Sequence, residues 1–176
     1  MNYLQIEKAS VANGKGIRTV LWVSGCSLHC KGCQNPESWD FNAGKPFDDN
    51  AKQELFTYLE NPYIQGLTIS GGHPLEYENL ADICNLVYDC KQQFPQKDIW
   101  LYTGKELTYQ DFLYAPAGWC NENLVNEIVR HCDVVVDGRY IEELRDTTLP
   151  FRGSSNQRLI DVKQTINDKK IVLFKV

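Results

Sequence analysis

Three cysteines lie close together near the start of the chain, at Cys26, Cys30 and Cys33, separated by three and by two residues. This spacing also matches the apolar face of a helix, so a buried helix is the alternative interpretation. Gly32 inside the run and Pro36 just after it are poor helix residues and oppose that alternative. We therefore expect a loop that gathers three thiols around one metal centre.

The number of thiols narrows the choice of metal. Structural zinc sites use four ligands. The nearest further candidate ligand is His29, which stands between Cys26 and Cys30 and is poorly placed to coordinate the same metal ion. An iron–sulfur cube ordinarily takes four thiolates, so three cysteines leave one iron with an open coordination position. The pattern therefore favours a catalytic [4Fe–4S] cluster. A zinc-binding interaction module and a non-catalytic iron–sulfur electron carrier are the alternatives.

Apolar, β-rich runs alternate with amphipathic helical stretches along the chain. Strand–helix–strand repeats predict right-handed units and a mainly parallel sheet. The 176 residues are too few for a closed eight-stranded barrel. The fold class is therefore α/β, as a partial (β/α) barrel or an open doubly wound sheet, in a single domain over 1–176. We expect strands over 3–6, 18–24, 66–70, 98–103, 133–137 and 170–176, and helices from 48 or 49 to about 60, over 77–93 and over 123–131.

The unusual residues follow predicted strands directly. Gly25 and Cys26 come after the strand at 18–24, Gly71–Gly72–His73–Pro74 after the strand at 66–70, and Gly104 after the strand at 98–103. In open parallel sheets and in barrels, active sites lie at the carboxyl ends of the strands. We therefore expect these loops to meet at one site.

Composition excludes several classes of function. The net charge of −5 without a Lys/Arg block argues against nucleic-acid binding, and no apolar run approaches the length of a membrane span. The N-terminus does not resemble a signal peptide, and seven cysteines are an odd number, so a reduced cytoplasmic setting is favoured over a disulfide framework. Cys84 is expected on the apolar face of its helix and Cys90 away from it, and the default expectation for both is a buried thiol that acts as a small hydrophobic residue. Residues 114–123 are expected to form an irregular insertion.

Several segments together point to a known family. They are Asn13–Arg18, then Gly25–Asn35 with the three cysteines, Trp39, and the segments 134–140 and 151–158. Over about residues 1–165 the chain closely resembles the glycyl-radical-enzyme activases of the radical S-adenosylmethionine superfamily. The segment at 151–158 makes it most similar to the branch that acts on anaerobic ribonucleoside-triphosphate reductases.

The resemblance implies a fold, cofactors and partners. It implies a partial (β/α) barrel of the radical-SAM type, with a [4Fe–4S] cluster on Cys26, Cys30 and Cys33 and S-adenosylmethionine on the open iron. Reductive cleavage of S-adenosylmethionine would then generate a glycyl radical on the large subunit of the reductase, with electrons from a donor such as flavodoxin. No catalytic side chain is implied beyond the cluster and the cofactor. A related enzyme acting on a small molecule is the alternative within the superfamily. The implied cofactor contacts are Gly32, Cys33, Gln34, Gly71, Gly72 and His73.

Two positions depart from the family pattern. An aromatic residue often precedes the third cysteine, where this chain has Gly32. The motif after the second core strand is usually Gly-Gly-Glu-Pro, where this chain has His73 in place of the glutamate. A histidine offers no permanent negative charge, so we expect it to act as a neutral acceptor, through its backbone carbonyl, or only as a turn residue.

The segment 151–158 combines an aromatic residue, two arginines and small polar residues, which suits the rim of a docking site for the protein substrate. The alternative is a capped turn formed by Ser154, Ser155 and Asn156. Arg139 could pair with a carboxylate of the cofactor or the partner, or serve only the structure. The expected partner contacts are Arg139, Phe151, Arg152 and Arg158.

Overall fold

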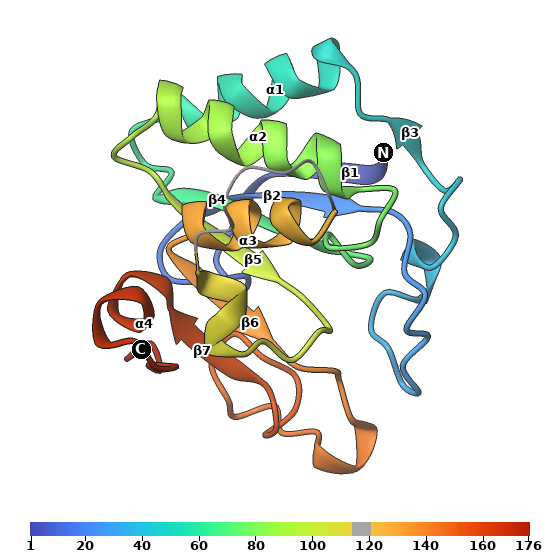
Figure 1. The fold of residues 1–176 in the computed structure, drawn as a ribbon. Helices are drawn as coiled ribbons and strands as arrows, with labels where there is room; N and C mark the ends of the chain where they lie inside the picture. Colours follow the sequence, from blue (N-terminus) through green and yellow to red (C-terminus); the bar gives the residue numbers. More distant parts are fainter. Residues whose placement is uncertain (114–120) are drawn as a thin grey trace.

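The computed structural model describes residues 1–113 and 121–176, with the side chains of 121–123 left out. Seven strands form one sheet in the order β3-β1-β2-β4-β5-β6-β7 (Figure 1). The strands are β1 (Asn2–Ser10), β2 (Arg18–Val23), β3 (Lys45–Pro46), β4 (Gly66–Gly71), β5 (Asp98–Tyr102), β6 (Val134–Asp137) and β7 (Arg158–Asp161). The α-helices are α1 (Asp49–Leu59), α2 (Leu80–Gln93), α3 (Asn121–His131) and α4 (Val162–Asp168), and short 3-10 turns span Pro36–Ser38, Tyr109–Phe112 and Glu142–Leu144.

Parallel strands make the centre of the sheet. β2, β4, β5 and β6 run in the same direction, whereas β1 and β3 on one side and β7 on the other are antiparallel to their neighbours. The sheet is open, with β3 and β7 at its two ends. The structure confirms the α/β class and places the four central strands within one residue of the predicted bounds.

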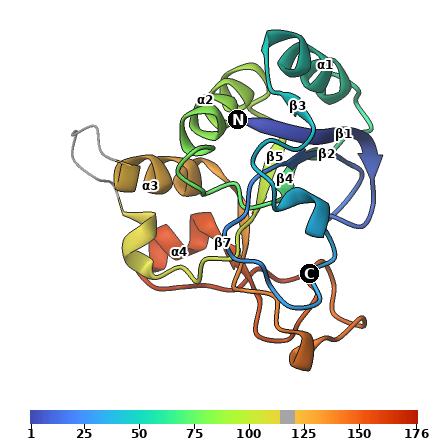
Figure 2. The ribbon, with the colours of Figure 1, turned by 90° about the vertical axis from the view of Figure 1, so that its right-hand side faces the viewer.

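The two faces of the sheet are covered differently. Along β5, Ile99 and Leu101 belong to the main hydrophobic core, whereas Trp100 between them belongs to a smaller cluster with Val134 and Val136. The four helices form an arc along the face of the main core (Figure 2). The loops that follow β2 and β6 lie toward the opposite face (Figure 2). The helices therefore leave one face of the sheet for the functional loops.

A capping residue explains where α1 begins, and the helical period explains which residues of α2 are buried. The side chain of Asp48 accepts a hydrogen bond from the backbone N–H of Ala51 at 2.9 Å and caps α1 as predicted. α2 begins at Leu80, later than the predicted residue 77. Cys90 is fully buried in the main core, which confirms the default expectation of a buried thiol and shows that its predicted direction, away from the apolar face, is wrong. It lies seven residues after Ile83, two helical turns along the same face.

The C-terminal region differs most from the prediction. β7 and α4 were not predicted, although Asp161 caps α4 by accepting the Gln164 N–H at 2.8 Å. Residues 170–176 form no regular strand, but the Asp161 N–H donates to Val172 O at 2.9 Å and the Phe174 N–H donates to Leu159 O at 2.8 Å. This C-terminal segment therefore lies along the outer edge of β7. The insertion expected over 114–123 falls mostly outside the described residues, and α3 begins at Asn121.

No helix in the described part of the chain has both the length and the apolar character that crossing a membrane requires.

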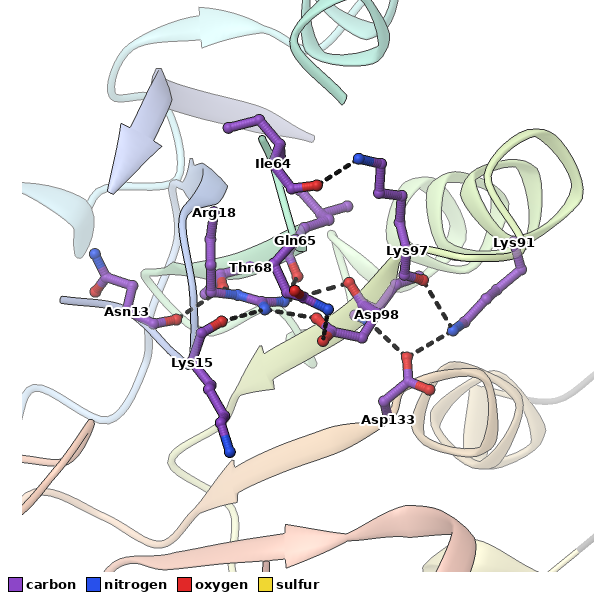
Figure 3. Close-up of polar contacts among 12 residues, drawn as sticks. Asn13, Lys15, Arg18, Ile64, Gln65, Thr68, Lys91, Lys97, Asp98 and Asp133 are labelled. Atoms are coloured by element: carbon purple, nitrogen blue, oxygen red, sulfur yellow. Dashed lines mark hydrogen bonds and ion pairs between the residues drawn. The ribbon is translucent and has the colours of Figure 1, made fainter. Parts of the chain in front are cut away.

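A buried arginine joins the amino ends of the central strands (Figure 3). Arg18, fully buried at the start of β2, donates from Nε to Thr68 Oγ1 at 2.7 Å and from a terminal nitrogen to Leu67 O at 2.8 Å. A second terminal nitrogen pairs with the Asp98 carboxylate at 2.5 Å, and the guanidinium lies 5.2 Å from the ring centroid of Trp100. Burial lowers the pKa of Arg18, and the charge of Asp98 opposes that effect. β2, β4 and β5 are thereby tied together below the functional loops.

Candidate cofactor site

A cavity of about 420 Å³ opens at the carboxyl ends of the parallel strands. One part of its wall carries Cys26, Cys30 and Cys33, a second part carries 70–73 at the end of β4, and a third carries 102–104 at the end of β5. The loops that the sequence placed at the ends of three strands therefore meet at one cavity. Gln34 also lines it, as do Gly71, Gly72 and His73 among the predicted cofactor contacts.

The connection between β6 and β7, residues 138–157, forms a further part of the wall. Gly138, Tyr140 and Arg152 line the cavity from this connection, together with Phe151. Exposed contacts join it to the cysteine loop: Arg139 donates to Leu28 O, and Lys31 Nζ pairs with Glu143 at 2.9 Å. The predicted site thus gains a wall from a region far away in the sequence.

The cysteine run is a loop, as predicted, and backbone hydrogen bonds fix its path. The N–H of Gly25 donates to Ser38 O at 2.8 Å, and the N–H of Cys26 donates to Trp39 O at 3.1 Å. A turn closes between the second and third thiols, where the Cys33 N–H donates to Cys30 O at 3.1 Å. Gly32 inside this turn has a φ of 72°, a left-handed conformation that favours glycine.

The three thiols are free and differ in burial. Cys26 is buried, and burial raises the pKa of its thiol, whereas Cys30 and Cys33 are partly exposed. The Asn35 N–H donates to Cys33 Sγ at 3.4 Å. Within the described part of the chain, no group of three or more His, Cys, Asp or Glu side chains is arranged as a metal-ion site. Soft sulfur donors on one cavity wall are ligands of the type that iron–sulfur clusters use.

The glycine loop packs directly on the cysteine loop. The Gly72 N–H donates to Val23 O and the His73 N–H donates to Gly25 O, both at 2.8 Å. A Cβ added at Gly72 would lie 2.5 Å from Gly25 O and 3.0 Å from Ser38 O, both backbone atoms. Only glycine therefore allows this close approach between the two loops.

His73 joins three loops as a neutral side chain. Its Nε2 lies 2.8 Å from Thr103 Oγ1 and its Nδ1 lies 3.3 Å from Glu76. Burial lowers the pKa of His73, and the nearby Glu76 opposes this in part, so the ring is neutral at pH 7. Glu76 also accepts hydrogen bonds from the N–H and the hydroxyl of Ser27, each at 2.7 Å. Both ring nitrogens of His73 are thus engaged within the chain.

The remaining cofactor contact, Gly32, lies outside the residues that line the cavity. A Cβ there would lie 2.1 Å from a carboxylate oxygen of Glu142, a side chain of the β6–β7 connection. A cofactor contact at Gly32 stays a prediction. Sequence reasoning missed Tyr140 and Asn13 as lining residues, although both stand in segments that carried the family resemblance.

The expected partner residues have different environments. Arg158 donates to both carboxylate oxygens of buried Asp137, at 3.0 and 2.5 Å, and to Leu107 O at 2.8 Å. Its guanidinium therefore serves the fold, and its position gives no support to a partner contact. Arg139 is exposed but binds the cysteine loop, as described above. Phe151 and Arg152 line the cavity.

The turn at 154–157 is present as well. The side-chain oxygen of Gln157 accepts from the N–H of Gly153 at 2.9 Å and from the N–H of Ser154 at 3.1 Å. The Asn156 side chain donates to Arg139 O at 2.8 Å. The polar part of segment 151–158 is thus a capped turn, whereas Phe151 and Arg152 before it face the cavity.

Comparisons with known proteins identify the family. The model of the 4Fe-4S single cluster domain family matches residues 12–160. The chain is 41% identical over 159 residues to the anaerobic ribonucleoside-triphosphate reductase-activating protein of Haemophilus influenzae, covering 89% of this chain and 96% of that protein. The proteins of the same name from Pasteurella multocida and Escherichia coli are both 38% identical over 89% of this chain, covering 95% and 96% of their own lengths. These matches confirm the resemblance, and the chain belongs to the family of anaerobic ribonucleoside-triphosphate reductase-activating proteins.

Proposed function

We propose that this protein activates an anaerobic ribonucleoside-triphosphate reductase by generating a glycyl radical on its large subunit. The observation that carries the proposal is the cavity where three free thiols, the loop 70–73 and the β6–β7 connection meet. In this proposal the whole chain, 1–176, is one radical-SAM domain of the partial (β/α) barrel type. Parallel central strands with helices along one face support that interpretation.

Cys26, Cys30 and Cys33 would hold a [4Fe–4S] cluster and leave one iron for S-adenosylmethionine. When bound, the cluster would supply one electron for the reductive cleavage of S-adenosylmethionine, so that a hydrogen atom could be removed from a glycine of the reductase. The protein contributes position and exclusion of water. Gly71 and Gly72 would bring backbone close to the cofactor, and both line the cavity together with Gln34. The His73 N–H ties the glycine loop to the cysteine loop by donating to Gly25 O, and the neutral His73 side chain contributes no charge.

The protein substrate must deliver its glycine to the same cavity, because the radical reacts only within contact distance. The exposed apolar residues Ile141 and Leu144 stand on the β6–β7 connection beside the cavity wall, which makes this connection the side on which we place docking. Electrons would come from a donor such as flavodoxin in the cytoplasm. The docking contacts expected at Arg139, Phe151 and Arg152 remain predictions.

The decisive experiment combines the anaerobically reconstituted protein with a reductant, S-adenosylmethionine and the large reductase subunit. We expect a glycyl-radical signal in electron paramagnetic resonance and equal formation of methionine and 5′-deoxyadenosine. A reductase subunit whose radical glycine is replaced by alanine serves as the control and should give no such signal. Cofactor cleavage without any radical on the native subunit would contradict the proposed substrate.

Gly72→Ala should destabilise the fold by roughly 1–3 kcal/mol, the cost of overpacking, and should also weaken binding of S-adenosylmethionine because the cysteine loop is displaced. The added Cβ pushes against Gly25 O and Ser38 O, which cannot yield without moving the cysteine loop. Equilibrium dialysis with labelled cofactor measures the affinity, and iron analysis measures cluster content. Gly16→Ala is the control, because Gly16 does not line the cavity and its Cβ would meet only the flexible Gln65 side chain. Equal losses in the two variants would show that the loop contact is unimportant.

A further inference from the structure

The Glu76 carboxylate lies against the cysteine loop but does not line the cavity. Its Oε1 accepts one hydrogen bond from the backbone N–H of Ser27 and one from the Ser27 hydroxyl, each at 2.7 Å. Ser27 follows Cys26 directly in the sequence. The Glu76 side chain is only 14% exposed. A carboxylate sheltered from most of the solvent is therefore bound to the residue next to the first thiol.

The hydrogen bonds of Glu76 come from uncharged donors. Burial alone would raise the pKa of Glu76, but the hydrogen bonds from Ser27 and the proximity of His73 outweigh it and lower the pKa, so the group is ionised at pH 7. An ionised carboxylate only accepts, so the proton of the neutral His73 ring is on Nδ1, 3.3 Å from Glu76 Oε1. His73 Nε2 then accepts from the Thr103 hydroxyl at 2.8 Å. None of the three donors neutralises the carboxylate.

The backbone that carries Glu76 is fixed beside the cysteine loop. The Glu76 N–H donates to His73 O at 3.0 Å and closes a turn. The buried side chain of Asn79 donates to His73 O at 3.2 Å and to Ser24 O at 3.0 Å, and Ser24 stands two residues before Cys26. The fold itself therefore sets the position of the carboxylate relative to the cysteine loop.

The other charges at the cysteine loop are of both signs. On the side of the β6–β7 connection, Lys31 pairs with Glu143 at 2.9 Å, Arg139 donates to a backbone carbonyl of the loop, and the Glu142 carboxylate lies over the turn between the second and third thiols. These two positive and two negative charges offset one another. The negative charge of Glu76, which is surrounded by neutral donors, is not offset in this way.

The charge of Glu76 already acts on the nearest thiol. Burial is the main cause of the raised pKa of Cys26, and the negative charge of Glu76 adds to that rise, while backbone hydrogen bonds at Leu28 and His29 oppose it. The carboxylate thus opposes the gain of negative charge at Cys26. Through the low effective dielectric constant of a sheltered site, it should oppose the addition of an electron to a metal centre there as well.

We propose that the Glu76 carboxylate lowers the reduction potential of the iron–sulfur cluster that the three cysteines hold. This inference rests on the proposed function. The charge and the hydrogen bonds around a cluster set its potential, and groups behind the direct ligands tune a metal centre in this way. A lower potential makes the reduced cluster a stronger electron donor, which the reductive cleavage of S-adenosylmethionine requires. Glu76 therefore acts through its charge and is not a catalytic residue.

The test separates the charge of Glu76 from its hydrogen bonds. All three donors reach Oε1, so the amide oxygen in Glu76→Gln can accept the same hydrogen bonds while the charge is lost. The midpoint potential of the reconstituted cluster is measured by redox titration followed by electron paramagnetic resonance. We expect Glu76→Gln to shift the one-electron equilibrium about tenfold toward the reduced cluster, a rise of about 59 mV, with the iron content unchanged.

Glu78→Gln is the matched control, because Glu78 is exposed on the same loop and loses the same charge. Its potential should stay close to that of the unmodified protein, since water and salt screen an exposed charge. Glu76→Asp keeps the charge on a shorter side chain and should also keep the potential. If Glu76→Gln does not load the cluster, Glu76→Asp and Glu76→Ala decide, because only the alanine variant should show the rise.

An unchanged or lower potential in Glu76→Gln would overturn the inference. Equal shifts in Glu76→Gln and Glu76→Asp would also overturn it, because a shift that persists with the charge present reports a displaced loop. Failure of the proposed function looks different: the unmodified protein itself would hold no reducible cluster, or would reduce its cluster without cleaving S-adenosylmethionine.

Discussion

Cys26→Ala, Cys30→Ala and Cys33→Ala should each abolish the iron–sulfur cluster and, with it, all cleavage of S-adenosylmethionine. The unmodified protein should contain about four iron and four sulfide per chain after anaerobic reconstitution. Each of the three thiols lines the cavity, and the chain offers no other thiol there among the described residues, so the loss of one leaves a cluster with too few ligands. Iron and sulfide analysis with electron paramagnetic resonance measures the result.

Cys84→Ala and Cys90→Ala are the controls and should keep the cluster. Both lie in α2 and pack in or against the main core, and burial raises the pKa of the Cys90 thiol to about 12, which disfavours the thiolate that a metal needs. Stoichiometric zinc without iron in the unmodified protein, or a cluster retained in Cys33→Ala, would defeat the assignment.

Arg18→Met should destabilise the fold by about 1.5–3 kcal/mol, the range for losing hydrogen bonds of a charged group, because the Asp98 side chain is 28% exposed and stays partly solvated. The substitution removes the ion-pair partner of Asp98 and the donor to Thr68 Oγ1 (Figure 3). It also removes the donor to the carbonyl of Leu67. Urea unfolding of the reconstituted protein under anaerobic conditions, at equal cluster content, measures the change in the free energy of unfolding.

Adding Asp98→Asn to Arg18→Met should restore part of the lost free energy of unfolding. The second substitution removes the negative charge of Asp98, which the first substitution leaves without its ion-pair partner. Arg145→Met, outside the buried network, should change the free energy of unfolding by less than about 0.5 kcal/mol. A loss for Arg18→Met as small as that of the Arg145 variant would show that the network contributes little to stability.

Local sequence patterns predicted the central strands because each is a short apolar run bounded by glycine or polar residues. The run from Thr19 to Val23 is buried almost throughout, as expected for a strand covered on both faces. The two-residue strand β3 is too short to give such a signal. β7 was missed because its polar residue Arg158 resembles a surface arginine, and only the fold reveals its partner Asp137, 21 positions earlier in the chain.

The part of the site that depends on the spacing of residues along the sequence could be predicted. The cysteine spacing and the position of the glycine loop after its strand placed Cys26, Gly72 and His73 at one end of the sheet, and all three line the cavity. Long-range contacts could not be foreseen. The Ser27–Glu76 hydrogen bonds join residues 49 positions apart, and the unpaired state of the Arg152 Nε depends on the absence of neighbours in space.

The C-terminal segment along β7 has a consequence for assembly. An exposed strand edge can recruit a strand from another chain, either as a specific mode of peptide binding or as the start of aggregation. On β7, Val172 O and the Phe174 N–H already occupy the hydrogen-bonding groups of Asp161 and Leu159. A peptide arriving at this edge therefore cannot extend the sheet there, and recognition on this side must be achieved by side chains.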